Sequence, residues 1–367
     1  MSMVLSGSTP SPSSDLSTAP RSLRPAAGSP RVAVVIPNWN GEPHLRTCLE
    51  ALERQTLRLE MEVWVVDNGS TDGSVALVTE LAWVKLIRNH ENCGFAAACN
   101  QAIIASDSPF VALLNNDVVV AADWLERLLE VIVEAPRVGS CASKVLNQTD
   151  PRVIDNCGHV LYADGLTRGR GRLEPDDGRF DRIEEVFCPS GCACLLRREM
   201  LDDVGLFDEA FFAYCEDADL GFRGRLRGWS CLFVPAAVAY HRFSGSSVTA
   251  YSSLKALNVE RNRLWLAVKN LPLPLLVMSV GATLARYAWQ AVGALTHRGA
   301  SGAFVRERSA PELMRILLAS YRQGLVGLPR AWRQRRRIQA RRTASILEIL
   351  SWLRRFGVGA RRIALLD

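Results

Sequence analysis

Three stretches decide the fold: VAVVIPNWNG (32–41), VWVVDNGSTDGS (63–74) and FVALLNNDVVV (110–120). Each begins as a short, continuous apolar run, which is typical of a parallel strand covered on both faces, and each continues into polar residues. Helices are predicted over 42–55, 94–105 and 122–134, another after the loop 67–73, and a further strand over 84–87. Four alternations of strand and helix in about a hundred residues predict a right-handed, mostly parallel α/β sheet.

The pattern changes after Val138, where a second half of the domain is expected. Short strands are predicted over 158–162, 187–196, 231–234 and 237–240, and a helix over 218–227. This half is expected to be the acceptor and catalytic half, attached to a nucleotide-sugar-binding half. The predicted organisation is a disordered lead (1–30), a domain (31–270) with halves 31–136 and 137–270, and a helical tail (271–367).

Charge is distributed unevenly along the chain. The 367 residues are 48% hydrophobic, enough for a sizeable core, and the formal net charge is +6. From Ala300 onward, 15 Arg stand against 4 acidic residues, a balance of +11 that leaves −5 on the rest of the chain. A mildly acidic body with a basic tail predicts that the tail meets something anionic.

The ten cysteines follow no secretory signal peptide, and no charged, amphipathic targeting peptide is apparent. Because they lie in apolar stretches, reduced and buried thiols in a cytosolic enzyme are expected. Cys188, Cys192 and Cys194 cluster, but no second Cys/His pair follows at zinc spacing, which disfavours a zinc site.

Two segments of the tail are apolar. Leu271–Ala285 carries no charge before Arg286 and is marginal as a bilayer span. Further on, Arg residues flank a helical apolar stripe made of Ile346, Leu347, Ile349, Leu350 and Leu353. This pattern predicts contact with an anionic membrane surface, the alternatives being a helical hairpin packed on the core and a true span. Nucleic acid is disfavoured as a partner because no recognition motif accompanies the arginines.

Polar loops follow four predicted strands, and in open parallel sheets ligands bind at the carboxyl ends of the strands. A nucleobase and ribose need planar partners and a carboxylate, roles that suit Trp39 and Asp67, although Asp67 also suits an Asx-turn or a helix cap. A diphosphate needs a hard divalent cation, and Asp117, just past a buried strand, offers a carboxylate oxygen for it. Its alternative role is a cap on the next helix.

A second acidic group, Glu216-Asp217-Ala218-Asp219, follows an aromatic run. A helix start uses one or two such carboxylates for its dipole, which explains Asp219 but not all three. Transfer to an acceptor hydroxyl needs a base, and one of the other two fits that role. His241 ends a predicted strand; a lone His is more often structural, but beside a metal–diphosphate site it is a candidate third ligand.

Seven motifs together resemble family 2 glycosyltransferases, with the rhamnosyltransferase-like branch of bacterial surface-polysaccharide synthesis as the nearest match. The resemblance covers about residues 32–270. The motifs, in order along the chain, are VAVVIPNWNG, VWVVDNGSTDGS, NCGFAAACNQAI, FVALLNNDVVV, PSGCACLLRREML, VGLFDEAFFAYCEDADLGFR and VPAAVAYHRFSGSS.

The resemblance implies an α/β fold of the GT-A type, a mixed sheet with flanking helices, to which this chain adds a helical C-terminal extension. It implies an inverting hexosyl transfer from a nucleoside-diphosphate sugar, with rhamnose suggested. A glycan or lipid-linked acceptor at the inner membrane face is inferred from the basic tail, and the protein is then expected to be cytoplasmic and peripheral on that face of the cell membrane.

The resemblance also implies roles for individual residues. By this resemblance, Asp117 and His241 bind a Mg²⁺ or Mn²⁺ ion. The base is one of the pair Glu216-Asp217, with Asp217 preferred. The donor is bound by residues of the same motifs, which are Pro37, Asn38, Trp39, Asn40, Asp67, Ser70, Asn92, Gly94, Asn100, Asn115 and Asn116.

One position departs from the family pattern. The metal motif reads Asn115-Asn116-Asp117, so its first carboxylate is an amide, which attracts a metal less. Rival enzymes fit worse: PNWNG is neither the Gly-rich loop of a nucleotidyltransferase nor the G-x-G-x-x-G of an NAD enzyme. The rival of another class is an inactive nucleotide-sugar binder, which predicts loss of Asp117 or of the acidic pair, and both are present.

Overall fold

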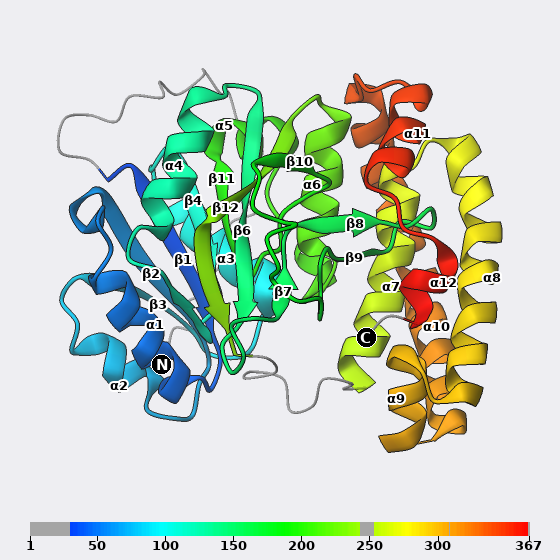
Figure 1. Ribbon diagram of the computed structural model, residues 1–367, viewed down its shortest axis with the longest axis horizontal. Coiled ribbons are helices and arrows are strands. Elements are labelled where there is room, and N and C mark those ends of the chain that lie inside the picture. Colours follow the sequence, from blue (N-terminus) through cyan, green and yellow to red (C-terminus); the bar gives the residue numbers. More distant parts are fainter. Residues whose placement is uncertain (1–29, 243–252, 308, 366–367) are drawn as a thin grey trace, which may run out of the picture.

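The computed structural model describes residues 30–242, 253–307 and 309–365. The predicted disordered lead over 1–30 therefore lies, except for residue 30, outside the described residues. A mixed sheet forms the centre of the molecule, and the C-terminal helices lie together at one side of it (Figure 1).

The first half of the sheet is parallel, as predicted. Its strands lie in the order β4-β1-β2-β3, with every pair in parallel register. The strands are β1 (Val32–Asn38), β2 (Met61–Asn68), β3 (Val84–Asn89) and β4 (Phe110–Leu114), joined through α1 (Glu42–Glu53), α2 (Ser74–Thr79) and α3 (Gly94–Ala105). The apolar runs of β1 and β4 are buried because helices cover both faces of the sheet.

The second half makes the sheet mixed. β11 pairs antiparallel with β4 and β6, and β6 pairs parallel with β12. The elements are β5 (Val118–Val120), α4 (Trp124–Glu134), β6 (Val138–Asn147), β7 (Ile154–Asn156), β10 (Glu184–Val186), β11 (Ala193–Arg197), α5 (Arg198–Val204), α6 (Glu216–Leu226) and β12 (Ser230–His241), with single 3-10 turns at Arg58–Glu60 and Glu209–Phe211.

Two predicted strands differ from the structure in this half. The strand expected over 187–196 begins only at Ala193, because the preceding residues form a buried loop at the edge of the site. The strands expected over 231–234 and 237–240 are one strand, β12, whose register shifts between Val234 and Val238. Pro235 lies within the shift, and its nitrogen has no hydrogen to donate to the ladder.

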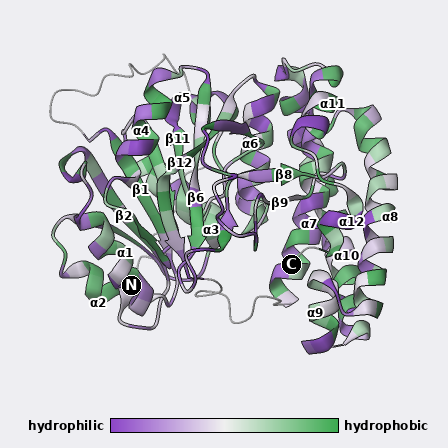
Figure 2. Ribbon diagram, viewed as in Figure 1, coloured by the Kyte–Doolittle hydropathy of each residue, from purple (hydrophilic) through white to green (hydrophobic). Residues whose placement is uncertain are grey.

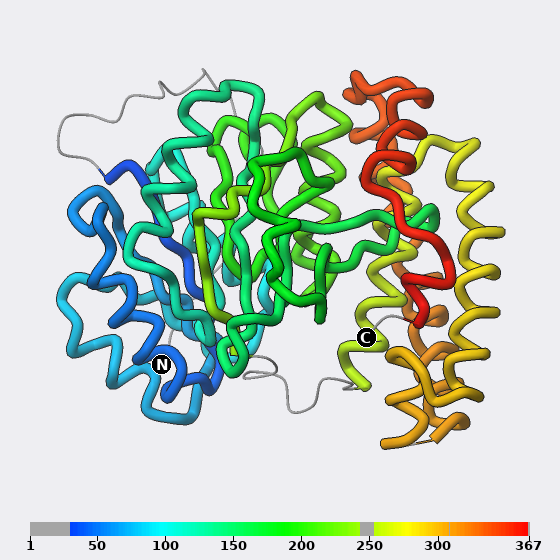
Figure 3. Tube along the Cα trace, in the orientation of Figure 1, coloured from blue at the N-terminus to red at the C-terminus, as the bar shows by residue number. Residues whose placement is uncertain are grey.

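A hairpin of β8 (His159–Leu161) and β9 (Thr167–Gly169) reaches from the sheet to the tail (Figure 3). The backbone N–H of Leu161 donates to the carbonyl of Phe356 at 2.8 Å. At its tip, Asp164 accepts from Arg286 Nε at 2.8 Å, and Arg286 Nη1 donates to Glu260 at 2.6 Å; all three side chains are buried. A buried charge cluster therefore fastens the tail to the hairpin.

The C-terminal part of the chain is helical. It consists of α7 (Ser253–Asn270), α8 (Leu273–Thr296), α9 (Gly299–Glu307), α10 (Ala310–Arg341), α11 (Ile346–Arg355) and α12 (Ala360–Leu365). Within the described ranges, no helix has the length and apolar character needed to pass through a membrane. Trp352 packs edge-on against Phe222, with ring centroids 6.1 Å apart, so tail and sheet share a core across the boundary predicted at residue 270.

Three of the five residues of the stripe on α11 that was predicted to meet a membrane pack on this shared core, and Ile346, at 36% exposed, does not. Ile349 is fully buried, and Leu350 and Leu353 are partly buried against the same cluster. Leu347, by contrast, is 78% exposed. For α11 itself the structure supports the alternative of a packed helix.

Candidate active site

Asn38, at the end of β1, connects three of the predicted polar loops. Its Nδ2 donates to Asp67 Oδ1 at 3.2 Å, and its Oδ1 accepts from Asn116 Nδ2 at 2.7 Å. All three side chains are buried. Because parallel strands end at the same edge of a sheet, residues far apart in sequence meet here.

Asp67 and Ser70 shape the loop after β2. The backbone N–H of Ser70 donates to Asp67 Oδ2 at 3.0 Å, which is the local turn weighed as the alternative for Asp67. Ser70 Oγ in turn accepts from the Asn40 N–H at 2.9 Å. Trp39, which follows Asn38, has 48% of its surface exposed, and Pro37, which precedes Asn38, is half-buried. An exposed aromatic residue and a fixed carboxylate therefore stand at the ends of the neighbouring strands β1 and β2.

The loop after β3 is fixed by Asn92, whose Oδ1 accepts from the Gly94 N–H at 2.9 Å. Gly94 has φ +86, and a Cβ there would lie 2.5 Å from the carbonyl oxygen of Phe212, so only glycine fits. Asn100, nearly two turns further along α3, has a structural use: its amide binds the backbone of Phe207 and the Glu209 carboxylate. We therefore leave Asn100 out of the proposed donor site.

Asp117 and His241 come together through the antiparallel register of β5 and β12, in which His241 lies opposite Val118. His241 Nε2 is 3.4 Å from Asp117 Oδ1, and Nδ1 is 2.7 Å from Asp155 Oδ2. Burial alone would lower the pKa of His241, but the two carboxylates outweigh burial and raise it to about 10. Asn115 and Asn116 directly precede Asp117 in the chain; Asn116 is buried and Asn115 is half-buried.

Asp155 was missed by the sequence analysis. It lies on β7, 86 residues from His241, and receives a second contact from Arg172 Nη1 at 2.8 Å. A carboxylate on one imidazole nitrogen fixes the ring so that the other nitrogen faces a ligand. No local pattern marks this role in the stretch Val153–His159.

The acidic pair begins α6, after Cys215 at φ +67. Asp217 Oδ2 accepts from the Gly191 N–H at 3.0 Å, and Oδ1 accepts from Ala218 N–H at 2.7 Å. Glu216 is buried, and burial followed by the charge of Asp217 raises its pKa well above the usual range. Asp219 pairs with Arg223 and Lys269, the structural role expected for it.

The loop 189–192 contacts both groups of acidic residues. The Gly191 N–H of this loop donates to Asp217 Oδ2 at 3.0 Å. The Cys192 carbonyl also accepts from the Asn115 N–H at 2.9 Å. The metal-side pair and the acidic pair therefore lie around the loop 189–192.

Asp117 and His241 together fit a divalent cation. They offer one carboxylate oxygen and one imidazole nitrogen, ligands that Mg²⁺ or Mn²⁺ accepts. Among the described residues, no group of three His, Cys, Asp or Glu side chains is arranged to hold a metal alone. Such a cation would therefore need further oxygens from a bound ligand, as a diphosphate provides.

All ten cysteines are free thiols, most of them buried, as expected.

Comparison with known proteins agrees with this geometry. Residues 33–205 match the sequence model of glycosyl transferase family 2. The N-acetylglucosaminyl-diphospho-decaprenol L-rhamnosyltransferase of Mycobacterium tuberculosis (strain H37Rv) is 30% identical over 237 residues, 58% of this chain and 76% of that protein. The chain belongs to glycosyltransferase family 2. It is an enzyme of the glycosyltransferase class, and the resemblance inferred from its motifs is confirmed.

Other relatives of this glycosyltransferase are longer. An uncharacterized protein of Sinorhizobium fredii is 30% identical over 243 residues, 62% of this chain but 26% of its own length, so this chain spans about a quarter of it. Among solved structures, the mannosyltransferase PcManGT of Pyrobaculum calidifontis, in complex with GDP-Man and Mn²⁺, superimposes with a TM-score of 0.51. It is 19% identical, with 85% of this chain and 86% of that chain covered, which confirms the GT-A fold.

Proposed function

We propose that this glycosyltransferase moves a sugar, rhamnose, from a nucleoside-diphosphate donor to a glycan or lipid-linked acceptor, with inversion, in cell-surface polysaccharide synthesis. One observation carries the proposal: the loop 189–192 bonds both to Asp217 and to the segment that leads into Asp117 and His241. The same segment bonds through Asn116 to Asn38, at the strand ends that bear Trp39 and Asp67. The rhamnosyltransferase relative supports the choice of sugar and of a lipid-linked acceptor.

In this proposal each loop binds one part of the donor. Trp39 stacks on the nucleobase, and Asp67, held by Asn38 and Ser70, binds the ribose hydroxyls. Asn92, Gly94 and the amides of Asn115 and Asn116 line the same edge of the sheet.

Asp117 and His241 would hold the divalent cation, whose charge stabilises the departing nucleoside diphosphate. Asp217 takes the proton from the acceptor hydroxyl as that oxygen attacks the anomeric carbon. The N–H of Gly191 fixes the Asp217 carboxylate from the other side, so the base is oriented before the acceptor binds.

Purified protein incubated with a panel of nucleotide sugars and a lipid-linked N-acetylglucosaminyl diphosphate tests the proposal through nucleoside-diphosphate release. We expect release from one donor with Mn²⁺, loss of release with EDTA, and a product whose anomeric configuration by NMR is opposite to that of the donor. Donor binding without release, for every acceptor tried, would instead support the inactive nucleotide-sugar binder. Release that survives EDTA would remove the cation from Asp117 and His241.

A further inference from the structure

The outer face of α8 is apolar along nearly its whole length. Every exposed residue from Leu273 to Leu295 is apolar or glycine, and the one charged residue in this stretch, Arg286, is buried. Val277 is 66% exposed and Leu284 65%. Figure 2 shows α8 as mostly green and white. Continuous apolar surface of this kind marks a contact with another molecule or with a membrane.

A second apolar stripe on α10 adjoins the first. The hydroxyls of Tyr287 on α8 and Tyr321 on α10 are 2.8 Å apart. Because residues three and four apart share a side of a helix, Leu284 and Leu318 flank this contact. The resulting surface, here called the α8–α10 face, consists of Leu273, Val277, Val280 and Leu284 of α8 and Met314, Leu318, Leu325 and Trp332 of α10, all exposed.

Arginines form a rim beside this face. Arg315, Arg322 and Arg333 are exposed, and their spacing is close to whole helical turns, so they form one row along α10. None of them has an ion pair within the described part of the chain. By contrast, tail arginines that face the sheet are paired, as Arg330 is with Asp208 and Arg355 with Glu185. The rim therefore leaves positive charge for an external partner.

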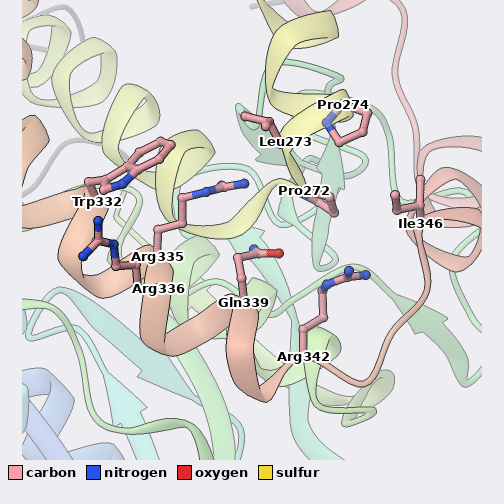
Figure 4. Close-up of a pocket in the computed structure, with 9 residues that line it drawn as sticks. All are labelled: Pro272, Leu273, Pro274, Trp332, Arg335, Arg336, Gln339, Arg342 and Ile346. Carbon is pink, nitrogen blue, oxygen red and sulfur yellow. The ribbon is translucent and has the colours of Figure 1, made fainter.

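One end of the α8–α10 face opens into a cavity of about 460 Å³ (Figure 4). Pro272, Leu273 and Pro274 line one side of it, and Arg335, Arg336 and Arg342 reach it from α10 and its end. No carboxylate lines the cavity. Arg335 is 8% exposed and is held by the carbonyls of Val268 and Leu271, so its position is fixed. This combination of guanidinium groups and apolar walls suits a phosphate that carries acyl chains.

We propose that the α8–α10 face docks on an anionic lipid bilayer, with both helices in the membrane plane and the arginine-lined cavity at a lipid phosphate. The row of arginines favours lipid over a second copy of this chain, because a copy would place the same positive charges opposite them. The proposal does not depend on the sugar, the acceptor or the transfer reaction.

Co-sedimentation of the full chain with vesicles tests the docking. We expect binding to vesicles of phosphatidylcholine with phosphatidylglycerol and much weaker binding to phosphatidylcholine alone. The double variant Val277→Glu/Leu284→Glu should lower the partition coefficient about tenfold or more, since each change places a charge in the lipid contact. Each of Arg322→Ala and Arg336→Ala should lower it about fivefold on the anionic vesicles only.

Matched controls lie on α11. Leu347→Glu and Arg354→Ala change equally exposed residues outside the α8–α10 face and should leave vesicle binding unchanged. Near-UV circular dichroism confirms that each variant is folded. Loss of binding in Leu347→Glu, or no vesicle binding by the parent chain, would overturn the proposal. A dimer seen by light scattering, broken by Val277→Glu without any vesicle binding, would assign the face to a second copy instead.

Discussion

Glu216 and Asp217 are neighbours in sequence but have different surroundings. Glu216 is buried with a raised pKa, which favours its neutral form, whereas both oxygens of Asp217 accept backbone N–H groups, which hold this side chain in place. A base must be ionised before it takes a proton, so these surroundings favour Asp217 for that role.

We expect Asp217→Asn to lower kcat by about 10²- to 10⁴-fold with little change in donor binding. Glu216→Gln should retain most activity, because the amide has nearly the shape of the neutral acid. Steady-state kinetics with titrated donor binding measures both. The reverse result, an active Asp217→Asn and an inactive Glu216→Gln, would transfer the role of base to Glu216.

His241 gives the fold a pH dependence when divalent cations are chelated. Its pKa in the folded protein is about 10, against about 6.5 in an unfolded chain. The stabilisation that protonated His241 gives the fold is therefore fully present below about pH 6.5 and is lost as pH rises through 10. Between these values the free energy of unfolding falls by roughly 1.4 kcal/mol per pH unit. Urea unfolding in EDTA should show wild type and His241→Gln converging over this window. A difference that stays constant with pH would contradict the assignment.

At the scale of secondary structure, the sequence predicts the parallel half well and the mixed half less well. β1 and β4 are buried on both faces, so their apolar runs are continuous, and α3 has the predicted bounds Gly94–Ala105. Phe187 and Cys188 are as buried as strand residues but lie in a loop, so apolar character alone placed the start of β11 too early.

The candidate site shows the same division. The loops at the strand ends follow from topology and could be predicted, including the local turn at Asp67. The contact of Asp155 with His241 and the burial that distinguishes Glu216 from Asp217 could not, because both depend on tertiary structure. Gly191, which orients Asp217, lies 26 residues from it and likewise has no local signal.

The β8–β9 hairpin depends on the charge cluster at its tip. Asp164→Asn would leave the buried guanidinium of Arg286 without one of its two carboxylates, so we expect a loss of about 3–5 kcal/mol in the free energy of unfolding. Glu50→Gln removes an exposed ion pair with Arg54 and should cost less than about 1 kcal/mol. Urea unfolding compares the two variants, and equal effects would argue against a structural role for the cluster.

At the scale of the whole molecule, the tail and the catalytic half share one hydrophobic core. Trp352 of the tail packs on Phe222 of the catalytic half, and Phe356 packs on Phe187. The predicted boundary at residue 270 thus separates segments in sequence that share a hydrophobic core.

We expect Trp352→Ala to destabilise the entire protein by about 3–5 kcal/mol, in one unfolding transition followed by both near- and far-UV circular dichroism. Leu347→Ala, on the same helix but 78% exposed, should change stability by less than about 0.5 kcal/mol. Two separate transitions in the parent protein, with only the later one shifted by Trp352→Ala, would mean that tail and sheet unfold independently.

The buried contact between Asp164, Arg286 and Glu260 has a consequence for how the protein responds to ionic strength. Added salt screens charges that water reaches, over a Debye length of about 8 Å at physiological concentration, but hardly affects ions enclosed by protein. Concentrated salt should therefore weaken any attraction between exposed arginines and lipid while leaving the enclosed ions in place. A salt wash of membranes would therefore release the intact enzyme, with the helical tail still packed against the β8–β9 hairpin.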